Sequence, residues 1–159
     1  MSMRPFVLIA LALVGLVAVS CGGDDDDAAP GDQGGAPASD VMVNLKNWAV
    51  EPSSRTLAAG IVKFSALHVA EHGAMDMAGQ EGATHQLVVS RLPDGAKAGQ
   101  SKYGAPVMNL TGIKPGETKT GEAELAPGTY ELACLVAEQV GGKTVNHYEK
   151  GMYTQVTVR

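Results

Sequence analysis

The sequence predicts an all-β domain, built as an antiparallel sandwich or barrel. From residue 41 onward, short runs alternate apolar and polar residues, and turn signals rich in Pro and Gly separate these runs. Helical periodicity is nearly absent, and only residues 96–103 could form a short helical turn between glycines. Many short strands joined by such turns are typical of sandwiches and barrels.

Each alternating run places its apolar side chains on one face, as a half-buried strand requires. In chain order the predicted strands are residues 41–46, 62–66, 85–89, 119–125, 130–134 and 152–158. The turn signals between them lie at residues 51–54, 58–60, 92–95, 114–116 and 126–128. Two polar segments, 69–83 and 135–146, interrupt the strand rhythm.

Residues 1–20 have the pattern of an export signal. Arg4 precedes an apolar run of 14 residues at 6–19, which is shorter than the roughly 20 residues of a membrane-spanning helix. The run ends in Ala-Val-Ser-Cys, which resembles a bacterial lipobox and predicts that Cys21 is lipidated and becomes the mature N-terminus. Ordinary cleavage nearby, giving a free secreted protein, is the alternative.

Residues 21–40 are rich in Gly, Asp and Pro and contain the acidic run Asp24–Asp27. Such a composition predicts a flexible tether with nothing apolar to bury. Acyl chains on Cys21 would hold the protein to a membrane surface without a spanning helix. We therefore expect one folded domain at 41–159, located on the extracytoplasmic face of a bacterial membrane, at the cell surface or in the periplasm.

The charge balance and the residue types exclude several classes of function. The chain has 12 basic and 17 acidic residues, a net charge of −5, and no basic stripe, so nucleic acid is not an expected partner. No Ser-His-Asp set, phosphate-binding loop or paired carboxylates can be recognised, so we do not predict an enzyme. We expect a monomer.

The cysteine count draws attention to Cys134. The chain has 2 cysteines, and lipidation of Cys21 would leave Cys134 without a disulfide partner. An unpaired cysteine in an exported protein is either a small buried hydrophobe or a metal ligand. The count alone leaves both interpretations open.

Three further residues near strand ends could join Cys134 in a metal site. His85 begins one predicted strand, Cys134 ends another, His147 precedes the last one and Met152 begins it. The parity of each strand turns His85, Cys134 and Met152 toward the interior. Thiolate, thioether and imidazole ligands favour copper over hard cations, and zinc rarely uses methionine.

The C-terminal third resembles a cupredoxin of the plastocyanin/azurin type. The segment Pro-Gly-Thr-Tyr-Glu-Leu-Ala-Cys at 127–134, the spacing His147-x4-Met152 and the segment beginning Thr84-His85 carry the resemblance. It implies a Greek-key β-sandwich of seven to eight strands that transfers single electrons between redox protein partners. It also implies one type 1 copper ion, with His85, Cys134 and His147 as equatorial ligands and Met152 as the weak axial ligand.

The sequence departs from this family in the loop between its cysteine and second histidine. That loop usually has two to four residues, whereas 12 residues, 135–146, intervene here. The entropy of closing a loop grows slowly with its length, so the insertion is tolerable. Gly141-Gly142-Lys143 is predicted to turn a small projecting hairpin that leaves the ligand-bearing ends together.

A second cluster of histidine and methionine lies at 68–77. His68, His72, Met75 and Met77 could hold Cu(I) in an exposed second site, or could be solvent-facing residues of a loop. His68 also competes with His85 as a ligand, because its parity turns it inward.

The main hypothesis is a membrane-tethered electron carrier. The alternatives are a copper chaperone, buffer or sensor, and a metal-free structural sandwich.

Overall fold

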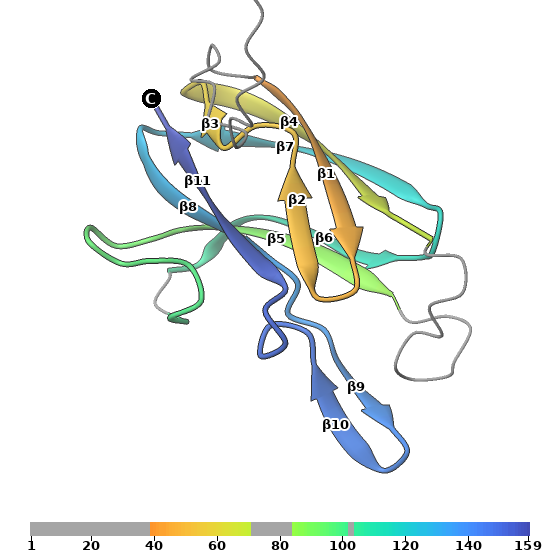
Figure 1. The fold of residues 1–159 in the computed structure, drawn as a ribbon. Coiled ribbons are helices and arrows are strands. Elements are labelled where there is room, and N and C mark those ends of the chain that lie inside the picture. The colour runs from red at the N-terminus through yellow and green to blue at the C-terminus, as the bar shows by residue number, and fades with distance from the viewer. Residues whose placement is uncertain (1–38, 71–83, 102–103) are drawn as a thin grey trace, which may run out of the picture. The chain divides into compact units, whose positions relative to one another are not determined.

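The computed structural model describes residues 39–70, 84–101 and 104–159, and Figure 1 shows how their strands are arranged. The strands are β1 (Asp40–Lys46), β2 (Ala49–Pro52), β3 (Thr56–Leu57), β4 (Gly60–His68), β5 (His85–Arg91), β6 (Pro106–Ile113), β7 (Thr118–Leu125), β8 (Gly128–Ala133), β9 (Ala137–Val140), β10 (Lys143–Asn146) and β11 (Tyr153–Val158). No helix occurs within these ranges, and residues 96–101, which belong to the predicted helical turn at 96–103, contain a turn at 98–99 and a bend at 100 instead. Accordingly, none of the described segments is a helix that could span a lipid bilayer.

Nine of the strands form two sheets that pack as a sandwich. The strand order is β2-β1-β4-β7 in one sheet and β3-β11-β8-β5-β6 in the other. Two neighbouring pairs, β1 with β4 and β3 with β11, are parallel, whereas the sequence predicted an antiparallel sandwich or barrel. Most neighbours in a sheet are distant in the sequence, so the sandwich is held together by long-range pairing.

The strand count exceeds the predicted seven to eight, because the described residues contain 11 strands. Four of the five strands beyond the six predicted ranges are short: β3 has 2 residues, and β2, β9 and β10 have 4 each. Two residues cannot show an alternation of apolar and polar side chains. The eight-residue strand β6 was not predicted either, because its buried and exposed residues do not alternate regularly. The other long strands, which carry that alternation, agree with the predicted ones.

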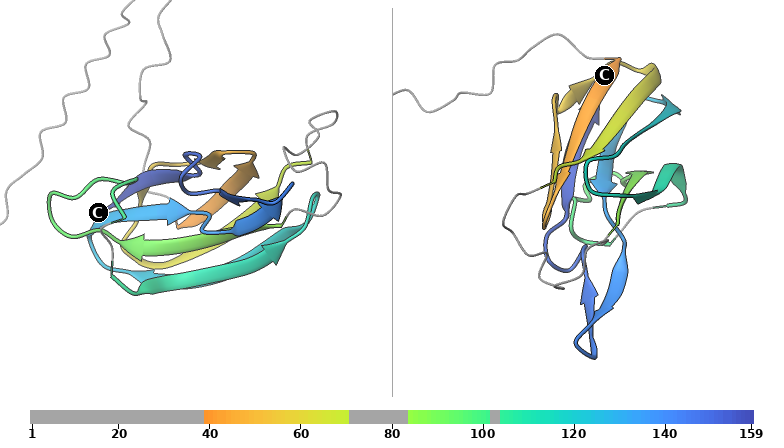
Figure 2. Two further views of the ribbon diagram at one scale, coloured as in Figure 1. Left: turned by 90° about the horizontal axis from the view of Figure 1, so that it is seen from below. Right: turned by 90° about the vertical axis from the view of Figure 1, so that its right-hand side faces the viewer.

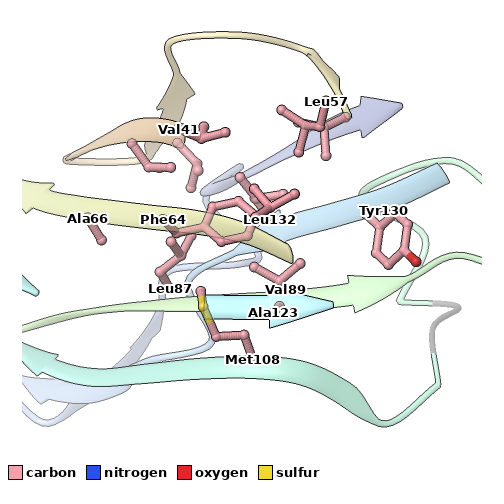
Figure 3. Close-up of a cluster of buried hydrophobic side chains, with 14 of the residues drawn as sticks. Val41, Leu57, Phe64, Ala66, Leu87, Val89, Met108, Ala123, Tyr130 and Leu132 are labelled. Carbon is pink, nitrogen blue, oxygen red and sulfur yellow. The ribbon is translucent and has the colours of Figure 1, made fainter. Parts of the chain in front are cut away.

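The core lies between the two sheets and consists mainly of alternate residues from the strands of those sheets (Figure 3). Every second residue of a strand points to the same face, which explains why the parity in the sequence predicted burial correctly. Burying each large apolar side chain contributes about 1.5–3 kcal/mol. Fully or almost fully buried core residues include Val41, Val43, Leu45, Val62, Phe64, Leu87, Val89, Leu132, Val156 and Val158.

β6 and β7 are consecutive in the chain but belong to different sheets, so the chain crosses between the layers here. The crossing depends on a close approach at Gly121 of β7. A Cβ atom at this position would lie 3.0 Å from Leu110 Cδ2 and 3.0 Å from Met108 Sδ. The absent side chain thus lets β6 pack directly over β7.

Three chain segments meet at one end of the five-stranded sheet. β5 begins there with His85, and β8, its antiparallel neighbour, ends there just before Cys134. The N–H of Cys134 donates to the carbonyl of Met152 at 2.9 Å, which continues the pairing of β8 with β11 beyond the last residues of the strands. The fold therefore brings the predicted ligand positions to the same edge.

The insertion at 135–146 forms the predicted hairpin, β9 and β10, which projects past this end of the sandwich (Figures 1 and 2). Its turn consists of Gly141 and Gly142, whose φ angles are 55° and 78°. Two successive positive φ angles are the requirement of the tight hairpin turn that glycine meets best. The N–H of His147 donates to the carbonyl of Val136 at 2.9 Å and closes the base of the hairpin.

Candidate metal centre

Three possible ligand atoms converge at the end of the sandwich. His85 Nδ1 and His147 Nδ1 lie 3.3 Å apart, and Cys134 Sγ lies 3.4 Å from His147 Nδ1 and 3.9 Å from His85 Nδ1. All three residues are buried, and Cys134 is a free cysteine. Within the described part of the chain, they form the group of side chains suited to hold a metal ion.

The spacing of these atoms fits a first-row metal ion. Bonds of about 2.0 Å to nitrogen and about 2.3 Å to sulfur, as for zinc, arranged in a trigonal plane would place the nitrogens ~3.5 Å apart and each nitrogen ~3.7 Å from the sulfur. The observed separations differ from these by a few tenths of an ångström. A His₂Cys trigonal set is the donor arrangement of type 1 copper.

Local irregularity of β5 helps to orient His85. The pairing of β5 with β6 shifts register between His85 and Leu87, although His85 still faces Ile113 of β6. A bulge of this kind re-aims a side chain at the end of a strand. The imidazole is fully buried, and its Nε2 has no hydrogen-bond partner.

Burial also keeps His85 neutral. Desolvation, followed by the nearby imidazoles of His68 and His147, lowers the pKa of His85 from 6.5 to about 3. A neutral imidazole is the form that binds a metal ion. His85 is therefore ready to act as a ligand at any pH well above its pKa.

The Cys134 sulfur lies in surroundings that oppose its ionisation when no metal is bound. Burial raises the pKa of the thiol, while hydrogen bonds from the backbone N–H groups of Val136 and Gln86 lower it, and the charge of Glu138 raises it further. Desolvation is the largest of these effects, so on balance the surroundings favour the thiol over the thiolate. Hydrogen bonds to the sulfur are a means by which proteins tune a copper–thiolate centre.

The main chain of Met152 is hydrogen-bonded to the main chains of two ligand candidates, Cys134 and His147. Its carbonyl accepts from the N–H of Cys134, and its own N–H donates to the carbonyl of His147 at 3.1 Å. The side chain is fully buried. The role of Met152 as the axial ligand stays a prediction.

His68 lies beside the three donor atoms but is not one of them. Its ring packs against the ring of His85 with centroids 4.0 Å apart. Its Nδ1 donates to the carbonyl of Ile113 at 2.9 Å, because a carbonyl oxygen can only accept. The structure thus places His68 as a buried neighbour of His85. The other members of the predicted second site, His72, Met75 and Met77, lie outside the described residues, as does Cys21.

Two residues that the sequence analysis did not predict for the site contact His147. Trp48, between β1 and β2, packs edge-to-face on the imidazole with ring centroids 5.1 Å apart. Glu138 of β9 lies with Oε1 3.1 Å from His147 Nε2. The only sequence signal for Glu138 is an acidic residue between two ligand candidates, and nothing in the sequence indicated where its hairpin would fold.

No family model matches the sequence, and no curated protein matches it either. Among solved structures, the chain is similar to dithionite-reduced auracyanin from the photosynthetic bacterium Roseiflexus castenholzii, with a TM-score of 0.53 and 16% identity over 78% of this chain and 99% of that one. Rusticyanin from Thiobacillus ferrooxidans matches with a TM-score of 0.43 and 17% identity over 77% and 79% of the two chains.

These findings define the class of protein by its fold. The expected cupredoxin-like β-sandwich is confirmed by the two sheets and by the likeness to auracyanin. The buried His-Cys-His cluster at the end of this fold suits one type 1 copper ion.

Proposed function

We propose that this protein carries single electrons between redox proteins while tethered by a lipid on Cys21 to the extracytoplasmic face of a bacterial membrane. The observation that supports electron transfer most directly is the convergence of His85 Nδ1, Cys134 Sγ and His147 Nδ1 in a buried cluster. Among the described residues, these three side chains form the one group of three or more potential metal ligands. Copper, when bound, would supply the exchange of one electron between Cu(II) and Cu(I).

The chain's own residues would hold the geometry constant during that exchange. His85 is locked between β6 and the ring of His68, and Cys134 and His147 are joined through the main chain of Met152. Side chains in a close-packed core change position little. A ligand frame of this kind limits rearrangement when the charge of the metal changes, which keeps electron transfer fast.

Addition of Cu(II) to the purified protein tests the site directly. We expect intense visible absorption from thiolate-to-copper charge transfer, together with the EPR signature of a type 1 centre. Cys134→Ser should abolish both, and His147→Ala should lose the type 1 spectrum while the protein stays folded. A colourless protein with only weak tetragonal copper would contradict the proposal.

The axial position can be tested separately. Met152→Leu should keep the visible absorption, because the three equatorial donors remain, and should change the reduction potential, which the axial ligand tunes. Protein-film voltammetry would measure the potential of both proteins. An unchanged potential would exclude Met152 as a ligand.

The tether follows from the sequence of residues 1–40. The acidic Gly/Asp/Pro-rich segment would let the domain reach donors and acceptors that are themselves associated with the membrane. Cells expressing the protein should incorporate labelled fatty acid into it, and Cys21→Ser should move it from the membrane to the soluble fraction. If the wild type and Cys21→Ser are both found in the soluble fraction to the same extent, a free secreted carrier would be favoured.

A further inference from the structure

The insertion places a carboxylate against the outer nitrogen of a metal-ligand candidate. Glu138 Oε1 lies 3.1 Å from His147 Nε2, on the side of the ring opposite the Nδ1 that faces Cys134 and His85. The His147 side chain is 1% exposed and that of Glu138 is 25% exposed. This nitrogen therefore meets a charged acceptor instead of open solvent.

The construction of the hairpin determines this contact. In the segment that enters β9, Val136 and Glu138 are partly buried, whereas Ala137 and Gln139 are exposed. The period of two in a strand thus turns Glu138 toward the sandwich. The hydrogen bond from the His147 N–H to the Val136 carbonyl fixes the strand beside the ring.

A carboxylate selects one tautomer of a neutral imidazole. An ionised carboxylate only accepts hydrogen bonds, so the ring must carry its proton on Nε2 to bond with Glu138. The lone pair then lies on Nδ1, which is 3.4 Å from Cys134 Sγ and 3.3 Å from His85 Nδ1. Carboxylate–histidine–metal arrangements fix the ring orientation and raise the basicity of the ligand in this way.

We propose that Glu138 is the positioning residue of the copper site, and that the 135–146 insertion serves to deliver it. Its carboxylate holds His147 as the Nε2–H tautomer with Nδ1 presented to the metal. The copper-binding part of this inference rests on the proposed function. The hydrogen bond and the tautomer do not, because both exist in the metal-free protein.

The first test uses the metal-free protein. Nitrogen-15 NMR of the His147 ring, at a pH where the ring is neutral, should show the Nε2–H tautomer in the wild type. In Glu138→Ala the Nδ1–H tautomer should become populated. Glu138→Gln keeps the shape of the side chain, and should show the same change to a lesser degree, because an amide can donate as well as accept.

Glu149→Gln is the matched control, since it removes the same charge from an exposed residue two positions after His147. It should leave the His147 tautomer as in the wild type. Should Glu138→Ala fail to fold, the Gln variant gives the same comparison. A wild-type ring protonated at Nδ1, or equal tautomer populations in wild type and Glu138 variants, would overturn the proposal.

The second test measures metal affinity by competition of Cu(I) and Cu(II) with chelators. Loss of a carboxylate that orients a ligand histidine typically costs about 10- to 100-fold in metal affinity, and we expect the dissociation constant of Glu138→Gln to rise by that factor. Unchanged affinity in both Glu138 variants would overturn the role in copper binding. A wild type that binds no copper but shows the Nε2–H tautomer would reject the proposed function and retain the hydrogen-bonding role.

Discussion

At the scale of single residues, protons and metal compete for Cys134. The metal binds the thiolate, yet burial raises the pKa of this thiol, so the metal-free protein holds a proton on sulfur at neutral pH. His85 contributes no proton there, because its pKa is lowered to about 3. Metal uptake and proton release are therefore coupled mainly through the cysteine.

We expect copper binding to release about one proton from Cys134. The apparent affinity should then rise about tenfold for each pH unit below the pKa of the thiol. Titration calorimetry in buffers of different ionisation enthalpy measures the released proton. Cys134→Ser should show neither the release nor this pH dependence, and a pH-independent affinity in the wild type would contradict the coupling.

Glu131 of β8 is a buried carboxyl group. It accepts hydrogen bonds from the N–H of Gly99 at 2.6 Å and the hydroxyl of Tyr148 at 3.2 Å, while its Oε1 has no partner. Burial raises the pKa of Glu131 above its usual 4.5, and these two hydrogen bonds only partly oppose the effect. The fold therefore favours the protonated carboxyl.

The sign of the resulting pH dependence follows from the raised pKa. The stabilisation from protonated Glu131 is complete below the pKa of an unfolded glutamate and is lost as pH rises through the folded pKa. Glu131→Gln mimics the neutral form, so it should gain stability relative to the wild type as pH rises above 4.5. Denaturant unfolding across this range gives the difference, with exposed Glu124→Gln as control. If the free energies of unfolding of Glu131→Gln and the wild type differ by the same amount at every pH, Glu131 ionises normally.

At the scale of elements, the loop between β5 and β6 is fastened to the outer face of β8 and β11. Ala98 N–H donates to Gln155, Gly99 N–H donates to Glu131, and Ser101 N–H donates to the hydroxyl of Tyr148. The loop thereby covers the residue that follows His147. Its close contact depends on Gly99, where an added Cβ would collide with the Tyr153 ring.

Gly99→Ala should lower the free energy of unfolding by more than the backbone strain at a positive φ angle would by itself. Gly99 has a φ of +85°, and Gly95 in the same loop has a φ of +78° but open space around it. Gly95→Ala therefore measures the backbone strain, which is about 1–3 kcal/mol, and Gly99→Ala adds the cost of overpacking, typically about 1–3 kcal/mol. Urea unfolding compares the two. Equal losses would mean that the loop can move away from Tyr153.

The elements also show how far the sequence could predict this fold. The alternation in β1, β4 and β11 identified these strands and their buried faces, and Gly141-Gly142 identified the hairpin turn. The parallel pairing of β1 with β4 could not be predicted, because a strand shows the same alternation of apolar and polar residues whether its neighbour is parallel or antiparallel. The Glu138 contact was beyond it too, since it depends on where the hairpin lies relative to His147 and not on any local pattern.

At the scale of the whole molecule, the metal site connects three chain segments of the five-stranded sheet, and occupation should stabilise the fold. A ligand that binds only the native state adds about 4.1 kcal/mol at a concentration 1,000 times its dissociation constant. Copper should raise the melting temperature of the protein, and a chelator should reverse the increase. Cys134→Ser should lose most of the shift, and a melting temperature that copper leaves unchanged would argue against native-state binding.

The separation of the ligand candidates along the chain sets an order of events. Cys134 follows His85 by 49 positions, and His147 follows His85 by 62 positions. No short segment of the chain therefore contains the complete ligand set. The set forms only after β5 has paired with β8, a long-range closure of the kind that makes β-sandwiches slow to fold. The cluster is thus a late product of folding. A metal ion can therefore meet the complete ligand set only in the folded protein, in whichever compartment the folding is completed.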